Sequence, residues 1–306
     1  NHIIVPPTYM EPVTTLRRTL KHLAEQTFPV KNLHVMLSFE DREGKEAKTK
    51  AAKLEKEFAG VFGNLWATHH PDLPGEVKGK SSNTSWGAKE AKRMLIDEQG
   101  VDIKHTTITS EDADALMHPS YFACLSYHFL DDPDRYHKIW QGILLFYNNI
   151  WKVPMPVRVF SSLASVMSLY MVTRKDRLIN FSTYSVSLLM IDEIGYWDTD
   201  VIPEDWRLFF KAFFAREGKV IVEPIFLPIN ADAAEAEGTM KTLVNQYEQV
   251  KRWAWGVSDT PYVIKKWLMS DDVPFWEKTI RVLRVIEDHF LWPVNWFAIT
   301  IGALMP

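Results

Sequence analysis

The first third of the chain alternates short apolar runs with amphipathic segments, and this alternation constrains the fold more than any other feature. In the segment 12–26, Val13, Leu16, Leu20 and Leu23 recur at the three- and four-residue spacing of one helix face. We predict strands at 3–6, 33–39, 65–69 and 106–109, and helices at 12–26, 45–62 and 80–95. Strands that alternate with helices are typical of an α/β fold with a parallel sheet covered on both faces.

The composition excludes several classes of protein. The chain has 306 residues, of which 46% are apolar, enough to bury a sizeable core and too many for a disordered chain. A net charge of −4 gives no support for a nucleic-acid partner. The single cysteine, Cys124, excludes a disulfide scaffold, and we expect it in the core. The glycine-rich signatures of dinucleotide-binding and P-loop proteins are absent from the sequence.

The residues that follow the predicted strands are the first candidates for a site, because ligands of such sheets bind beyond the carboxyl ends of the strands. The segments 7–11, 40–41 and 110–114 follow three of these strands. Within the last, Asp112 and Asp114 point to the same side of an extended chain. Paired carboxylates of this kind suit Mg²⁺ or Mn²⁺. A helix N-cap would explain Asp41 or Asp114 singly, but it explains the whole set less well.

Two further groups carry polar chemistry. Glu204-Asp205 opens a predicted helix at 205–216, where Asp205 is either an N-cap or a general base. Gln249, Arg252 and Trp253 share one face of a helix predicted to start near Thr239. They offer an amide, a guanidinium fork for phosphate and a stacking plane. Taken alone, this second group is better explained as a helix with one core tryptophan and two solvated polar residues.

Two apolar stretches point to a membrane. Residues 290–306 carry no charge, and Trp292 and Trp296 at their start suit an interfacial aromatic belt. We expect the chain to be the soluble-side domain of a longer membrane protein, cut within a membrane segment; a buried C-terminal helix is the alternative. Residues 159–173, between Arg158 and Arg174, are too short to span, so we expect a buried helix or one lying in the interface.

In this order, the groups resemble a family 2 glycosyltransferase of the membrane-bound polysaccharide-synthase type, similar to cellulose and hyaluronan synthases. The resemblance covers almost the whole chain and rests on five elements: 5–11, 78–83, 112–114, 204–205 and the QxxRW motif at 249–253. It implies a GT-A fold with a mostly parallel sheet flanked by helices. Residues 1–289 would form the glycosyltransferase domain, divided into a nucleotide-sugar half (1–130) and an acceptor half with interface helices (131–289), followed by a truncated transmembrane segment (290–306).

The resemblance also implies a role for each matching residue. The donor would be bound by Thr8, Tyr9, Glu11, Asp41, Lys80, Asn83, Asp112, Gln249 and Arg252. Asp112 and Asp114 would hold Mg²⁺ or Mn²⁺, and Asp205 would be the catalytic base. The acceptor would meet Glu204, Trp253, Phe181, Ser182 and Thr183. Two departures stand out: the segment 181–185 lacks the glycine of the synthases' FxxG[ST] loop, and Glu40-Asp41 replaces their Asp-Asp pair.

The implied activity is inverting, metal-dependent transfer of a hexose from a nucleotide sugar to a glycan or lipid acceptor. A UDP-sugar is the leading donor and GDP-mannose the alternative; processive synthesis and single transfer both remain open. We expect a membrane location with the catalytic domain on the cytoplasmic side. A sugar nucleotidyltransferase is a competing class, although the segment 7–11 lacks its Gly-rich basic loop. A catalytically degenerate nucleotide-sugar-binding domain is the other.

Overall fold

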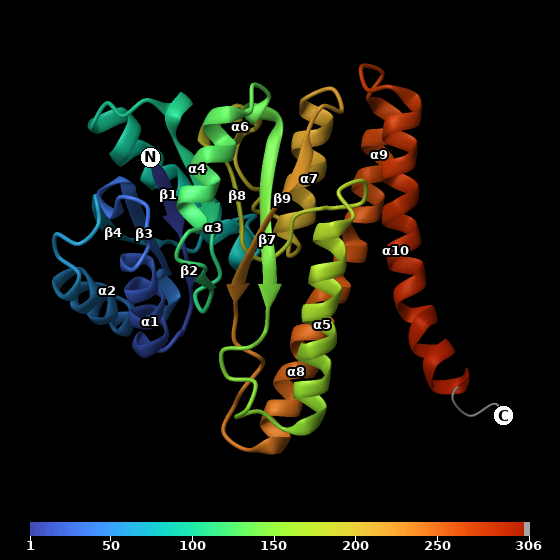
Figure 1. Ribbon diagram of the computed structural model, residues 1–306, viewed down its shortest axis with the longest axis horizontal. Coiled ribbons are helices and arrows are strands. Elements are labelled where there is room, and N and C mark those ends of the chain that lie inside the picture. Colours follow the sequence, from blue (N-terminus) through green and yellow to red (C-terminus); the bar gives the residue numbers. More distant parts are fainter. Residues whose placement is uncertain (303–306) are drawn as a thin grey trace.

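The computed structural model describes residues 1–302, except for the side chains of residues 292, 293 and 295–302. Figure 1 shows one sheet with helices on both faces and a group of long helices beside it. The strands are β1 (His2–Val5), β2 (Pro7–Thr8), β3 (Leu33–Glu40), β4 (Asn64–His70), β5 (Thr107–Ser110), β6 (Leu116–Met117), β7 (Lys138–Leu145), β8 (Tyr184–Ser187) and β9 (Ile221–Asn230). The helices are α1 (Val13–Ala24), α2 (Lys45–Glu57), α3 (Lys80–Lys92), α4 (Tyr121–Asp131), α5 (Met155–Thr173), α6 (Leu188–Ile194), α7 (Glu204–Ala215), α8 (Thr239–Ala254), α9 (Thr260–Met269) and α10 (Phe275–Gly302).

The first half of the sheet confirms the prediction of an α/β fold. Strands β4, β3, β1 and β5 pair in parallel, and each predicted strand lies within one residue of its observed bounds. The predicted helices are also present, although α1 and α2 end two and five residues early. The parallel register carries the ends of β1, β3 and β5 to one edge, as a parallel sheet requires.

The second half of the sheet adds antiparallel pairing. Strand β8 is antiparallel to both β5 and β7, whereas β9 runs parallel to β7. The strand order is β2-β3-β1-β5-β8-β7-β9-β6, with β4 on the outer side of β3. One sheet therefore runs through both halves that the sequence analysis separates at residue 130. The crossing from β5 to β8 places the segment before β8 next to the segment after β5.

Helix α3 approaches the sheet unusually closely. A Cβ atom built on Gly87 would lie 2.7 Å from Ser38 Oγ and 2.9 Å from a methyl carbon of Val5. The buried face of this helix consists mostly of small polar residues, and Asn83 anchors it. Ser38 Oγ donates to Asn83 Oδ1 over 2.7 Å, and Asn83 Nδ2 donates to the Ser38 carbonyl over 2.8 Å. This close packing holds Lys80, the first residue of the helix, at the edge of the sheet where the parallel strands end.

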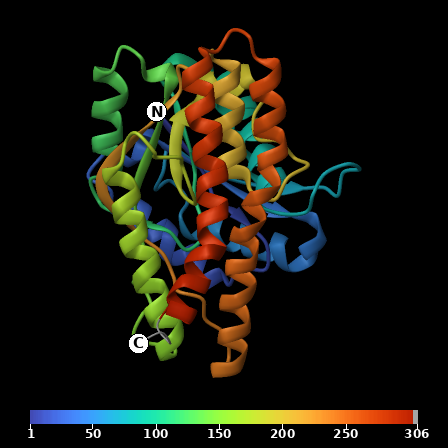
Figure 2. The same ribbon diagram turned by 90° about the vertical axis from the view of Figure 1, so that its right-hand side faces the viewer.

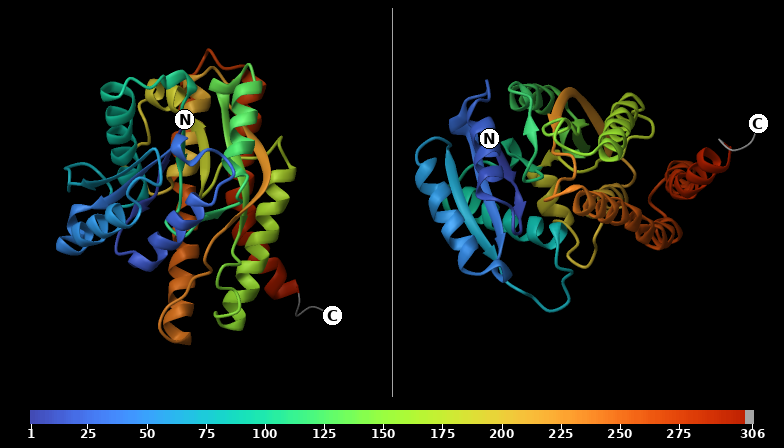
Figure 3. Two further views of the ribbon diagram at one scale, coloured as in Figure 1. Left: turned by 60° about the vertical axis from the view of Figure 1, so that its left-hand side comes forward. Right: turned by 90° about the horizontal axis from the view of Figure 1, so that it is seen from below.

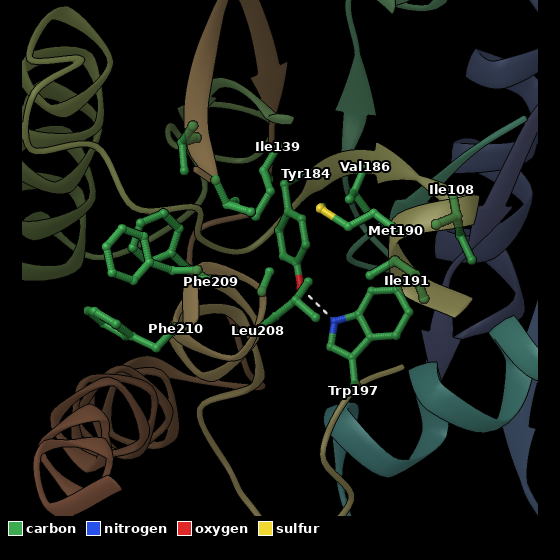
Figure 4. Packing of buried hydrophobic residues seen from close by; sticks show 14 of the residues in the cluster. Ile108, Ile139, Tyr184, Val186, Met190, Ile191, Trp197, Leu208, Phe209 and Phe210 are labelled. Atoms are coloured by element: carbon green, nitrogen blue, oxygen red, sulfur yellow. Dashed lines mark hydrogen bonds between the residues drawn. The ribbon is translucent and has the colours of Figure 1, made fainter. Parts of the chain in front are cut away.

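The larger hydrophobic core lies between the sheet and the helices α6 and α7. Figure 4 shows Tyr184 of β8 and Trp197 at its centre, with Phe209 and Phe210 of α7 packed nearby. Trp197 Nε1 donates to Tyr184 Oη over 2.6 Å, so two large buried aromatic residues satisfy their polar atoms together. This packing secures the start of α7, which carries Glu204 and Asp205.

The C-terminal helices stand beside the sheet. Figures 2 and 3 show α5, α8 and α10 extending toward the same end of the molecule, beyond the sheet. Side chains at 292, 296 and most of the predicted membrane segment 290–306 lie outside the described residues, and α10 is described as a helix to Gly302. Among the described residues, α5 alone is long and apolar enough to cross a membrane by length and composition. It has 19 residues, because the helix begins four residues before the segment 159–173, and one side of it is buried in the domain; whether it is a buried or an interfacial helix stays a prediction.

Candidate active site

Three distant segments meet at the ammonium group of Lys80. Its Nζ lies 2.7 Å from Asp112 Oδ1 and 2.8 Å from Glu204 Oε1. The same nitrogen donates to the carbonyl of Ser182 over 2.6 Å. Lys80 comes from the start of α3, Asp112 from the end of β5 and Glu204 from the start of α7. The structure therefore brings together three of the five elements on which the resemblance rests, namely 78–83, 112–114 and 204–205.

Charge pairing around Lys80 decides the protonation of Asp112. Burial alone would raise the pKa of Asp112, but the Lys80 ammonium and the Ser182 hydroxyl, which donates to Asp112 Oδ2, outweigh it and lower that pKa. Burial likewise disfavours the Lys80 ammonium, yet Asp112, Glu204 and Asp205 raise its pKa on balance. Lys80 and Asp112 are thus a charged pair at neutral pH.

Glu204 and Asp205 carry surplus negative charge. Burial raises the pKa of Glu204 to about 7, against the opposing effect of Lys80, and Asp205 adds to the increase. Burial also raises the pKa of Asp205. One lysine cannot neutralise three nearby carboxylates, so the site is poised to exchange protons near neutral pH.

Backbone N–H groups orient the Asp205 carboxylate. Ser182 N donates to its Oδ2 over 3.0 Å, and Trp206 N donates to its Oδ1 over 2.8 Å. Asn180 Nδ2 also donates to the Asp205 carbonyl over 2.9 Å. The helix α7 begins at Glu204 after Pro203, so Asp205 lies inside the first turn and is not the N-cap. The N-cap alternative considered from the sequence was therefore wrong.

The segment 180–183 is clamped from two sides. Ser182 adopts a left-handed backbone conformation with φ 58°, which is uncommon for a residue with a side chain. Buried Gln141 accepts from Phe181 N over 2.8 Å and donates to the Thr183 carbonyl over 3.1 Å. Asp112 N in turn donates to Thr183 Oγ1 over 3.0 Å. Ser182 thus occupies a backbone conformation that favours glycine.

Beyond Asp112, several carboxylates lie close together, and of these Asp232 is paired with Arg18. Burial raises the pKa of Asp114 to about 7, with Asp112 adding to the effect, and Asp232 N donates to Asp114 Oδ2 over 2.9 Å. Burial raises the pKa of Glu11, and Asp232 contributes to the increase. Glu111 is fully buried, and neither of its carboxylate oxygens has a hydrogen-bond partner among the described residues.

This acidic group can accommodate a hard divalent cation. Carboxylate oxygens are the ligands that Mg²⁺ and Mn²⁺ take, and the surplus negative charge around Asp112 and Asp114 is the charge that such an ion offsets. Within residues 1–302, no group of three or more His, Cys, Asp or Glu residues is arranged to hold a metal by itself. An ion held by two carboxylates and by substrate phosphates needs no such group.

The residues predicted to bind the nucleoside differ in their access to solvent. Tyr9 is exposed, and the Arg42 guanidinium lies 3.6 Å from its ring centre. Asp41 is exposed at the end of β3, whereas Thr8 is buried in the sheet. Asn83 is also buried, and its amide is bonded to Ser38 and to the Thr8 carbonyl. Thr8 and Asn83 therefore shape the backbone around this region, and a direct contact with the donor stays a prediction for each residue.

The QxxRW motif lies at the end of α8, without a hydrogen bond or ion pair to the Lys80 group among the described residues. Trp253 packs between the rings of Phe146 and Phe160, with centroids 6.0 Å from each. Gln249 accepts from Gln246 Nε2 over 3.1 Å. Arg252 is exposed and has no hydrogen-bond or ion-pair partner within residues 1–302. Its guanidinium is thus available to an anion.

Sequence reasoning missed several supporting residues. Asp232 follows the end of β9 and is held by two bonds from Arg18 Nη2, at 2.8 and 2.9 Å. Its position just after a strand, like that of Asp112, is the sequence signal that marks it. Glu111 is adjacent to Asp112 and gives no separate signal.

The fold and this group of side chains define a glycosyltransferase of the GT-A class, and comparisons with known proteins agree. The family model described as "Glycosyl transferase family group 2" matches residues 107–305, more than half of the chain. The chain belongs to this family. None of the curated proteins searched matches the chain.

Several solved structures share the fold at low sequence identity. TarS from S. aureus, in complex with UDP-GlcNAc, superposes with a TM-score of 0.59 at 13% identity, covering 98% of this chain and 75% of that one. The mannosyltransferase PcManGT from Pyrobaculum calidifontis, with GDP-Man and Mn²⁺, gives 0.55 at 14% identity, covering 99% and 79%. GalNAc-T7, with UDP, GalNAc and Mn²⁺, gives 0.51 at 13% identity, covering 100% and 58%.

Proposed function

We propose that this glycosyltransferase transfers a hexose from a nucleotide-diphosphate sugar to a hydroxyl of a glycan or lipid acceptor, with inversion at the anomeric carbon. The orientation of Asp205 by two backbone N–H groups, beside the Lys80–Asp112 pair, carries the proposal. A carboxylate with a raised pKa, held in one orientation, suits a general base that deprotonates an attacking hydroxyl. Direct attack from the face opposite the diphosphate forms the new glycosidic bond while the bond to the diphosphate breaks.

Lys80 and Arg252 are the positive groups assigned to stabilise the departing diphosphate. Lys80 is held charged beside Asp112, and Arg252 presents a guanidinium with no internal partner among the described residues. A preorganised cation at the place where negative charge develops lowers the barrier to transfer. Mg²⁺ or Mn²⁺, held by Asp112 and Asp114, would supply Lewis-acid stabilisation of the same charge. Gln249 and Arg252 are assigned to the diphosphate, and Tyr9, Glu11 and Asp41 to the nucleoside.

The donor and acceptor classes follow from the family and the resemblance to the synthases. TarS is solved with UDP-GlcNAc and PcManGT with GDP-Man, which supports a nucleotide sugar as the donor. We infer a UDP-sugar as the first choice, because QxxRW synthases use these donors. We assign Trp253 and the segment Phe181–Thr183 to the acceptor. The charge-free run 290–306 supports a membrane location, with the catalytic domain on the cytoplasmic side.

A donor panel tests this proposal. The chain is incubated with UDP-glucose, UDP-GlcNAc and GDP-mannose, with and without Mn²⁺, and the released nucleotide is identified. Release of a nucleoside diphosphate that depends on Mn²⁺ and on an added acceptor is the expected result. In a parallel assay with UTP and glucose 1-phosphate, or with GTP and mannose 1-phosphate, release of pyrophosphate would instead identify a nucleotidyltransferase. Binding of donor without turnover in any condition would favour a degenerate binding domain.

A further inference from the structure

A buried pair of opposite charges lies directly after the proposed base. Arg207 follows Asp205 by two residues, and its Nε lies 3.0 Å from Oδ1 of Asp259. Asp259 is fully buried, and the side chain of Arg207 is 12% exposed. The Arg207 guanidinium also lies over the ring of Tyr262, 3.7 Å from its centre. Solvent therefore has little access to either charge.

This pair joins the helix of the proposed base to the helix of the QxxRW motif. Asp259 is the last residue of η6 (Trp255–Asp259), a short 3₁₀ helix that continues directly from the end of α8. The segment η6 contacts α7 and α9 as well as α8. Within the described part of the chain, this pair is the one ion pair or hydrogen bond between the segment 249–259 and α7. It therefore holds the segment that follows Arg252 against the first turn of the helix that carries Asp205.

A gain in stability does not explain the two charges well. Neither carboxylate oxygen of Asp259 and not the Nε of Arg207 has a hydrogen-bond partner among residues 1–302, so the contact is a close approach of charges without an aligned hydrogen bond. Two buried charges repay the loss of their hydration only when their geometry is good and hydrogen bonds satisfy them. Apolar side chains of similar size often stabilise such a position equally well. The pair is better explained by the orientation that it imposes on the two helices.

Neighbouring charges connect the pair to the proposed active site. Asp198 Oδ2, on the loop before α7, lies 3.7 Å from Arg207 Nε, and Asp198 Oδ1 lies 2.7 Å from Lys211 Nζ one turn further along α7. Burial raises the pKa of Asp259 to about 7 against the opposing effect of Arg207, and Asp205 adds to the increase. The carboxylate of Asp259 therefore lies within electrostatic range of the proposed base.

We propose that Arg207 and Asp259 are positioning residues, which hold the proposed base and the QxxRW helix in one fixed relation. This inference rests on the proposed function, in which Asp205 acts at the attacking hydroxyl and Arg252 at the departing diphosphate. Direct displacement requires both groups to be correctly placed around the anomeric carbon at the same time, and a misplacement of about 1 Å can cost about a hundredfold in rate. Because both side chains of the pair are buried, their loss should lower kcat and leave the donor KM nearly unchanged.

Replacing the pair with apolar residues separates positioning from stability. Arg207→Met, Asp259→Leu and the double variant are compared with the unchanged chain by urea unfolding and by steady-state kinetics with the best donor and acceptor. The assays are done at pH 8, above the pKa of Asp259, where the pair is charged. Arg207→Lys keeps the positive charge and serves as the conservative variant. The matched control is Arg216→Met, which removes an ion pair with Glu193 at the other end of α7.

Each single variant is expected to unfold at a lower urea concentration, because one buried charge loses its partner, and the double variant should recover most of that loss. In the double variant kcat should nevertheless stay about tenfold or more below that of the unchanged chain, with the donor KM within about twofold. Arg207→Lys should keep more of kcat than Arg207→Met, and Arg216→Met should keep all of it.

A double variant that recovers both its stability and its kcat would overturn the proposal, because the pair would then be structural only. If the double variant does not fold, Arg207→Lys and Arg207→Met decide the question, and an equal kcat per folded molecule in these two would overturn it. Failure of the proposed function is seen separately, as an absence of nucleotide release by the unchanged chain, and it would overturn this inference as well.

Discussion

The backbone N–H of Ser182 donates to Asp205 Oδ2 over 3.0 Å, while the Ser182 hydroxyl bonds to Asp112. One residue in a left-handed conformation therefore joins the proposed base to the proposed metal ligand. The two carboxylates are 93 residues apart in the chain, and the Ser182 turn bonds to both of them beside Lys80.

Replacing Asp205 with asparagine should abolish transfer and leave donor binding largely intact. The amide cannot accept a proton from the attacking hydroxyl, but it has nearly the same shape. The measurements are nucleotide release and donor affinity by calorimetry. Asp200→Asn, at an exposed carboxylate on the preceding loop, is the control and should keep full activity. Substantial turnover by Asp205→Asn would remove this residue from the role of base.

Ser182→Gly should separate backbone strain from the hydroxyl bond. Glycine relieves the cost of a positive φ, about 1 kcal/mol, which offsets the loss of the bond to Asp112. Ser182→Ala loses the bond and keeps the strain, so it should be the less stable variant by about that amount. Chemical denaturation at neutral pH measures both. If the alanine variant were as stable as the glycine variant, the left-handed conformation would carry no cost.

Lys80→Met should destabilise the protein by about 2–4 kcal/mol, because it leaves Asp112 and Glu204 without their cation. Adding Glu204→Gln should recover part of that loss, because without Lys80 the buried Glu204 must either bind a proton or stay charged without a partner, and glutamine needs neither. Urea unfolding of the single and double variants gives the coupling. Full additivity of the two substitutions would show that Lys80 and Glu204 do not interact.

Glu204 should make the protein less stable as the pH rises toward neutrality. Its pKa is raised to about 7 in the folded state by burial, so the folded protein holds a proton that the unfolded chain releases near pH 4.5. The contribution of Glu204 to the free energy of unfolding is therefore greatest below about pH 4.5 and is lost as the pH rises to about 7. This loss amounts to at most about 3 kcal/mol. Glu204→Gln should lack this component. Parallel stability–pH curves for the two proteins would contradict the prediction.

Arg252→Ala should lower kcat/KM by about tenfold or more and leave the unfolding temperature unchanged, because the exposed guanidinium has no partner in the described part of the chain to lose. Steady-state kinetics with the best donor measures the effect. The matched control is Lys251→Ala, where the neighbouring base pairs with Glu248 at 3.3 Å. Similar kinetics for both variants would place Arg252 outside the diphosphate site.

Much of the parallel half of the fold could be predicted from the sequence, because strand and helix periods are local properties. The meeting of Lys80, Asp112 and Glu204 could be anticipated only through the resemblance to a family, since 124 residues separate the first from the last. Spacing along the chain says nothing about the antiparallel insertion of β8, which carries Ser182 and Thr183 onto Asp112. Nor could the pattern of apolar residues show which side of α5 packs against the sheet. The buried serines and the exposed apolar residues of this helix recur at the same spacing.

The close packing of Gly87 against the sheet restricts which substitutions the enzyme can tolerate at this position. Gly87 lies two helical turns from Lys80, on the same rigid element, and has no room for even a methyl group against Ser38 and Val5. With any larger residue, Ser38, Val5 or the helix would have to shift, and a shift of α3 would displace the ammonium group of Lys80. The position of the Lys80 ammonium group at the edge of the sheet thus depends on a buried glycine seven residues further along the same helix.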